Sequence, residues 1–60
     1  MEADFIYVNK DKSRSLVSEK IPGIPNVGDG KRNPQDPQRG YKIVGIVWGV
    51  TGITIWAVEQ

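Results

Sequence analysis

The chain has 60 residues, no cysteine and no histidine, and its eight basic and seven acidic residues leave a formal net charge of +1. This length allows one domain at most, whose own core would be only marginally stable. The missing residue types exclude disulfides, thiolate metal sites and histidine-based catalysis, and the near-neutral charge gives no support to nucleic-acid binding. We therefore expect no enzyme, no small-molecule substrate and no nucleic-acid partner.

Charge and apolar character are distributed unequally along the chain. All eight basic residues lie at or before Lys42, whereas the sixteen residues 43–58 carry no charge. The sequence is thereby divided into three predicted parts. These are a polar extramembrane segment over 1–20, an extended arm rich in proline and glycine over 21–40, and an apolar segment over 41–60.

The first part contains one short apolar run, which consists of Phe5, Ile6, Tyr7 and Val8. The run is too short to span a bilayer, and the acidic residues ahead of it do not fit a secretory signal. We expect it to form a short strand or loop that docks on a partner. Residues 10–20 alternate charge with serine and predict a solvated segment, with one or two helical turns as the alternative.

The second part, residues 21–40, holds all four prolines and four of the seven glycines. Proline fixes its own φ and restricts the residue before it, so we expect neither a regular helix nor a central strand here. Ile21, Ile24 and Val27 would anchor the arm in a groove of a partner, or the arm would be an unbound linker. The stretch GDGKR at 28–32 lacks the flanking strand, helix and spacing of a phosphate-binding loop.

The third part predicts a transmembrane helix. Residues 43–58 would rise about 24 Å as a helix, somewhat less than a bilayer core of about 30 Å. Tyr41, Lys42, Trp56 and Glu59 would anchor its two ends at the membrane interfaces. The predicted fold is thus an all-α membrane protein with one carboxyl-terminal helix and a mostly irregular amino-terminal arm.

The charge asymmetry also predicts an orientation. Basic residues precede the span and none follows it, so the amino terminus would lie on the matrix, stromal or cytoplasmic side. The host would be an inner mitochondrial, thylakoid or bacterial inner membrane.

Small residues recur along one side of this predicted helix. Gly45, Gly49, Gly52 and Trp56 fall at spacings of three and four, and GIVWG is a GxxxG motif. In lipid such a face lets another backbone approach closely, so it would pack against a larger membrane protein. Lipid or pigment would be able to contact the same face, and no intrinsic cofactor or metal site is expected.

A β-hairpin is the competing interpretation of the third part. Ten of the sixteen residues are Ile, Val or Thr, so KIVGIVW and ITIWAV would form two strands around GVTG. Neither strand alternates with polar residues, so both faces would require burial. The other forty residues supply too little apolar surface to cover both faces, and this argument favours the membrane helix.

The polar arm through Gly40, the basic edge from Arg39 to Lys42 and the stretch YKIVGIVWGVTGITIWAVE resemble small single-pass accessory subunits of respiratory and photosynthetic complexes. The stretch is similar to the helix of VIIa-type subunits of cytochrome oxidase. The resemblance implies a noncatalytic subunit that stabilises or assembles a larger bioenergetic membrane complex. Two other hypotheses stay open: a regulatory membrane peptide that binds a transporter or membrane enzyme, and a soluble β-rich interaction module.

Overall fold

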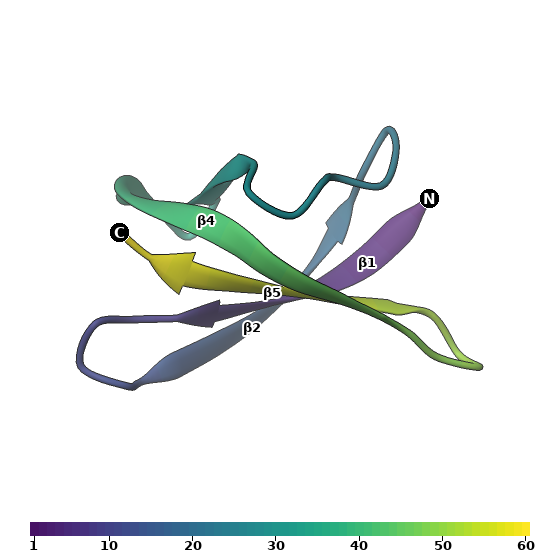
Figure 1. Cartoon of the computed structure of the whole chain (residues 1–60), viewed down its shortest axis with the longest axis horizontal. Helices are drawn as coiled ribbons and strands as arrows, with labels where there is room; N and C mark the ends of the chain where they lie inside the picture. Colours follow the sequence, from purple (N-terminus) through teal and green to yellow (C-terminus); the bar gives the residue numbers. More distant parts are fainter.

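The computed structural model describes all 60 residues and contains five strands and no helix. The strands are β1 (Glu2–Val8), β2 (Arg14–Lys20), β3 (Gly30–Asn33), β4 (Asp36–Trp48) and β5 (Ile53–Glu59). They form one sheet in the order β2-β1-β5-β4-β3. The first and last strands, β1 and β5, run parallel beside each other near its centre, and all other neighbours are antiparallel (Figure 1).

The prediction of an all-α membrane protein is wrong. Residues 43–58 form the second half of β4, a tight turn and β5, as the hairpin interpretation proposed. None of the secondary structure is helical, so the chain has no helix with the length and apolar character to cross a bilayer. The predicted integral-membrane location, the orientation and the membrane-anchored subunit all depended on that helix and are corrected with it.

Residues 43–58 form strands because their side chains suit a pleated sheet that is apolar on both faces. In β5, Ile55 and Ala57 are fully buried on one face, whereas Thr54, Trp56 and Val58 point to the other. Gly49 and Gly52 close the turn by exchanging backbone hydrogen bonds of 2.7 and 3.4 Å. The usual alternation of apolar and polar residues is absent, so the sequence shows no signal of period two.

The core lies on the concave face of the curled sheet. Its nine buried side chains come from four strands and the segment after β2: Ala3, Phe5, Tyr7, Val17, Ile21, Tyr41, Ile43, Ile55 and Ala57. A buried Asn33 at the end of β3 binds the Gln35 backbone N–H through its side-chain oxygen at 2.9 Å. Ile24, Ile46 and Ile53 pack around the margin of this core.

The proline-rich arm is part of the core instead of a groove-bound arm or a free linker. Ile21 is buried in the core and Ile24 packs against it. Further along the segment, the Gly28 N–H donates to the Ile43 carbonyl at 2.8 Å, and the Ile43 N–H donates to the Asp29 carbonyl at 2.9 Å. These contacts fix residues 21–29 beside the sheet and replace the second layer that a larger domain would use.

Two strands enter the second part, where the prolines predicted no central strand: β3 forms an edge of the sheet, and β4 begins there. Pro37 lies near the start of β4, between the pairs Asn33–Asp36 and Arg32–Gly40, where the register with β3 shifts. Its missing N–H therefore breaks no ladder hydrogen bond. Its carbonyl accepts a hydrogen bond of 2.8 Å from the Arg32 guanidinium, which holds the irregular strand end in place.

The sheet curls far enough for its two edge strands to interact. Lys31 on β3 donates to the Glu19 carboxylate on β2 at 2.8 Å, and the Tyr7 hydroxyl donates to the same carboxylate. The Lys31 ammonium also lies 4.7 Å from the centre of the Phe5 ring, within the range of a cation–π contact. The rings of Tyr7 and Tyr41 pack edge to face, with their centres 4.9 Å apart. We call this group, Tyr7, Glu19 and Lys31, the seam.

The seam predicts a specific alkaline sensitivity. Burial, together with the hydrogen bond to Glu19, holds the pKa of the Tyr7 phenol well above its usual value of about 10. The unfolded chain loses this proton near pH 10 while the folded chain retains it, so stability that is fully present below about pH 10 is lost above it. We expect this loss to reach at most about 1.4 kcal/mol per pH unit, measured by urea unfolding at about pH 8 and pH 11.

The Tyr7→Phe variant is the control for this prediction. It should be less stable at about pH 8 by about 1 kcal/mol, the usual net value of a hydrogen bond, and should lose less stability on going to pH 11. The variant lacks only the phenol hydroxyl, so the difference between the two alkaline losses reports on the Tyr7 phenol. Equal alkaline losses in both proteins would contradict the prediction.

Two glycines in different backbone conformations supply a second test: Gly45, from the predicted helix face, and Gly28, from the arm. A Cβ added at Gly45 would contact nothing within 4 Å, whereas Gly28 has a φ of +101° that disfavours any side chain. Gly45→Ala should therefore raise the free energy of unfolding by about 0.5–1 kcal/mol. Gly28→Ala should lower it by about 1–3 kcal/mol. Thermal unfolding followed by circular dichroism measures both, and a destabilised Gly45→Ala protein would favour close packing at that glycine.

Candidate interaction surface

The convex side of the sheet carries apolar side chains that no other part of the chain covers. Its members come from the four longer strands, and we call them the outer face: Ile6, Val8, Leu16, Val44, Val47, Trp56 and Val58. Leu16, Val44, Val47 and Val58 are exposed, and the other three are half-buried. A sheet normally buries an apolar face against a second layer, and here that layer is missing.

Strand register places the centre of the outer face in one row. Leu16 on β2 pairs with Ile6 on β1, Ile6 pairs with Trp56 on β5, and Trp56 pairs with Gly45 on β4. Val44 is the extra residue of a bulge beside Gly45, where the register of β4 shifts. A continuous apolar row therefore crosses four strands, with an indole at its middle.

Trp56 is oriented by its neighbours on this face. The Arg14 guanidinium lies 5.3 Å from the centre of the indole ring, in a cation–π contact. Gly45 opposite Trp56 has no side chain and open space where a Cβ would be. The Arg14 guanidinium therefore covers part of the indole, and the backbone of the paired Gly45 is bare of any side chain.

The two ends of the outer face differ in charge. At one end, Arg14 pairs with Val8, and Lys42 pairs with Val58, so this row has two positive charges. At the other end Glu2 and Asp4 project from β1, with Lys20 paired opposite Glu2. The side chains of Glu2, Asp4 and Lys20 sum to a charge of −1 at this second end. The Asp4 carboxylate accepts a hydrogen bond from the Ser18 hydroxyl at 2.6 Å.

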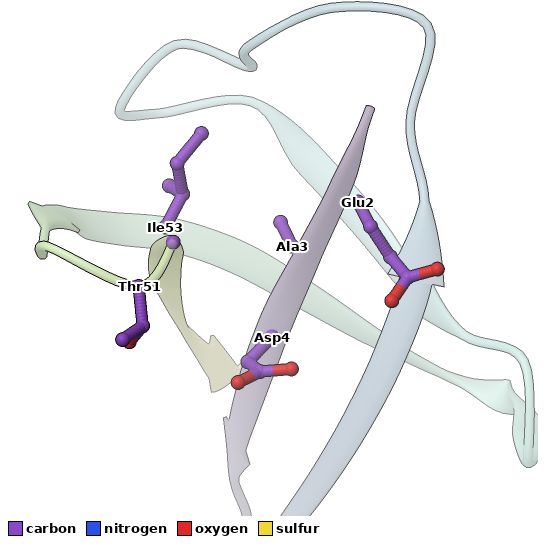
Figure 2. A pocket seen from close by; sticks show the side chains of 6 residues that line it. Glu2, Ala3, Asp4, Thr51 and Ile53 are labelled. Atoms are coloured by element: carbon purple, nitrogen blue, oxygen red, sulfur yellow. The ribbon is translucent and has the colours of Figure 1, made fainter.

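A shallow pocket of about 270 Å³ lies at the acidic end, where β1 separates from the β4–β5 turn. Figure 2 shows the side chains of the lining residues: Ala3 and Asp4 on β1 lie between Glu2 on one side and Thr51 and Ile53 on the other, and the Glu2 carboxylate projects away from the turn. The pocket is open to solvent and mostly polar, so it suits a cationic side chain better than an apolar one. No three carboxylates gather anywhere in the fold in a way that could hold a metal ion.

The β4–β5 turn projects at one end of the long axis of the molecule (Figure 1). Trp48 is 67% exposed there and Val50 is fully exposed, and no charged residue lies between residues 43 and 58. The turn continues the apolar character of the outer face beyond the sheet through Val47. It adds two exposed apolar side chains, Trp48 and Val50.

The structure separates the predicted docking residues into two groups. Phe5 and Tyr7 lie in the core with almost no exposure, as does Ile21, so they are unavailable to a partner. Ile6 and Val8 alternate with them and point to the outer face. Among the three predicted anchors of the arm, only Val27 is well exposed, on the segment that covers the core.

The predicted membrane anchors have other roles in the sheet. Tyr41 is a core residue whose hydroxyl donates to the Asn9 side chain, and Lys42 lies on the basic row. Trp56 is central to the outer face. Glu59 accepts a hydrogen bond of 2.9 Å from the Lys10 backbone N–H and lies 3.9 Å from the Arg39 guanidinium, so it fixes the end of β5 to the β1–β2 turn.

The predicted helix-packing face is divided in the same way. Gly45 lies in β4, whereas Gly49 and Gly52 close the turn, so the three glycines share no stripe. Only Gly45 and Trp56 are neighbours, and they are partners across two strands. The pairing of Gly45 with Trp56 results from sheet register and is unrelated to the helical spacing that predicted it.

Sequence reasoning missed Leu16, Val44 and Val47. Leu16 lies in a segment that charge and serine marked as solvated, and the two valines lay within the predicted span. The signal that locates the two valines is the missing polar alternation of both carboxyl-terminal strands, which indicates two apolar faces.

Comparisons with family models, curated proteins and solved structures found no match to this chain.

Two adjacent residues of β5 test the assignment of faces. Ile55 is fully buried and Trp56 is half-exposed on the opposite face. Ile55→Ala should cost about 2–5 kcal/mol of unfolding free energy, because it leaves a cavity. Trp56→Ala should cost clearly less in dilute protein, although it removes the larger side chain. Urea unfolding of both variants measures this, and a larger loss for Trp56→Ala would place the indole in the core.

Proposed function

We propose that this protein is a small noncatalytic β-sheet interaction module that binds a protein surface through its outer face. One observation carries the proposal: the second half of β4, residues 43–48, and β5 are largely apolar on both faces, and the chain covers only one of these faces. Apolar surface gains about 25 cal/mol per Å² when it is removed from water. A surface that covers the outer face would therefore supply what the fold lacks.

The composition of the outer face suits a protein partner. Apolar residues surround a central tryptophan with an arginine stacked on it, and Trp and Arg are the residue types that most often dominate binding energy at protein interfaces. Charged side chains lie at the two ends of the face, so they would form the polar rim that such interfaces have. The near-neutral charge of the whole chain does not favour a nucleic-acid partner, because binding through phosphate contacts requires a basic protein.

Two exposed aliphatic residues on opposite sides of the molecule provide a matched test. Leu16 on the outer face and Val27 on the core-covering segment are each 63% exposed, so an aspartate at either position should leave the fold intact. Proteins retained from extracts of the source cells by the wild-type chain should be lost with Leu16→Asp and retained with Val27→Asp. Quantitative mass spectrometry of the three samples measures this.

Circular dichroism of both variants is the control for folding. A bound protein that is retained equally by Leu16→Asp and the wild type would contradict the outer face as the binding surface. The same conclusion would follow if Val27→Asp alone lost it.

A further inference from the structure

We infer that the surface which covers the outer face is a second copy of this chain, packed face to face in a two-fold symmetric dimer. The inference rests on the proposed function and names the partner. A two-fold interface must be self-complementary, because the same patch contributes from both sides. The outer face meets this condition in charge, in size and in shape.

The charge distribution favours one orientation of the second copy. A two-fold axis parallel to the central row, Leu16–Ile6–Trp56–Gly45, reverses the strands of one sheet relative to the other. The basic end of each copy, with Arg14 and Lys42, then lies against the acidic end of the other, with Glu2 and Asp4. Each interface would contain this contact twice, so attraction between the ends adds to apolar burial.

The size of the molecule sets the scale of the interface. It measures 30 × 20 × 20 Å, so its broad side fits within a rectangle of about 600 Å², which is an upper limit for the projected outer face. Standard stable interfaces bury roughly 800 Å² of accessible surface on each partner, and accessible area exceeds projected area on a side-chain-covered surface. Two such sheets would pack about 10 Å apart with their strands rotated by about 30°, as in β-sandwiches.

The shape of the face supplies the third argument. Gly45 presents bare backbone beside the Trp56 indole, and Val44 and Val47 on the same strand project as exposed side chains. The proposed axis keeps each strand opposite its own copy, so a projecting valine of one β4 can lie over the bare backbone of the other, as side chains interdigitate between the layers of a sandwich. The missing second layer of each sheet is then the other sheet.

Sedimentation equilibrium and a charge-swap pair test the dimer. The wild-type chain of 6.7 kDa should sediment at about twice that mass at high micromolar concentration. Arg14→Glu and Asp4→Arg should each weaken the dimer by at least about tenfold, because each places like charges together twice. An equimolar mixture of the two variants should restore it, because a mixed dimer contains two attractive contacts. Leu16→Asp should also dissociate the dimer, and Val27→Asp should not.

Several outcomes would overturn the inference. A wild-type chain that stays monomeric up to millimolar concentration excludes the dimer, and failure of the mixture to recover excludes this orientation. A dimer that persists in Leu16→Asp uses another surface. Failure of the dimer is distinguishable from failure of the proposed function: a monomeric chain whose protein partner is lost only in Leu16→Asp retains the interaction module and rejects the second copy.

Discussion

The shape of this protein depends on the hydrogen bonds that the Glu19 carboxylate accepts. It receives hydrogen bonds from Lys31 and from Tyr7, and so connects β2 and β3, the two edge strands of the sheet. With only 60 residues, the chain has no second sheet or helix with which to enclose a core. Curling one sheet until its edges interact encloses Phe5, Tyr7 and their neighbours on the concave side, and it partly shields the edge strands from other chains.

The same curvature creates the convex outer face. Because strands alternate their side chains, every residue placed in the core leaves its neighbour on the other side, and in β5 these neighbours are Thr54, Trp56 and Val58. A chain in which the paired parts of β4 and β5 are apolar on both faces therefore cannot cover both faces by curling. The interaction module and the dimer proposed above both address this limit, because each supplies a second apolar surface.

Part of the sequence argument survives the correction of the fold. The conclusion that the chain cannot cover both faces of a hairpin at 42–58 was right, and the uncovered face is present. The error was to assume that an uncovered face must be in lipid. That reasoning left out the arm at 21–29, where Ile21 and Ile24 help to cover one face of the sheet. The prolines and glycines of the arm indicate only an irregular segment and give no sign of this packing. The division of roles between Phe5 and Ile6, or between Ile55 and Trp56, was likewise inaccessible without a sheet assignment.

The sequence alone determined that this chain has neither disulfides nor histidine chemistry. It also determined that the chain is too apolar at its carboxyl end to cover that surface itself. In the hairpin interpretation it also located the turn GVTG at 49–52. Only the tertiary structure decided between helix and strand for residues 43–58. The reason is physical: a segment that is apolar on every side has no period, and its conformation depends on which distant residues reach it. Here these are β1 and the arm, which pair with it and cover it over separations of up to about fifty residues.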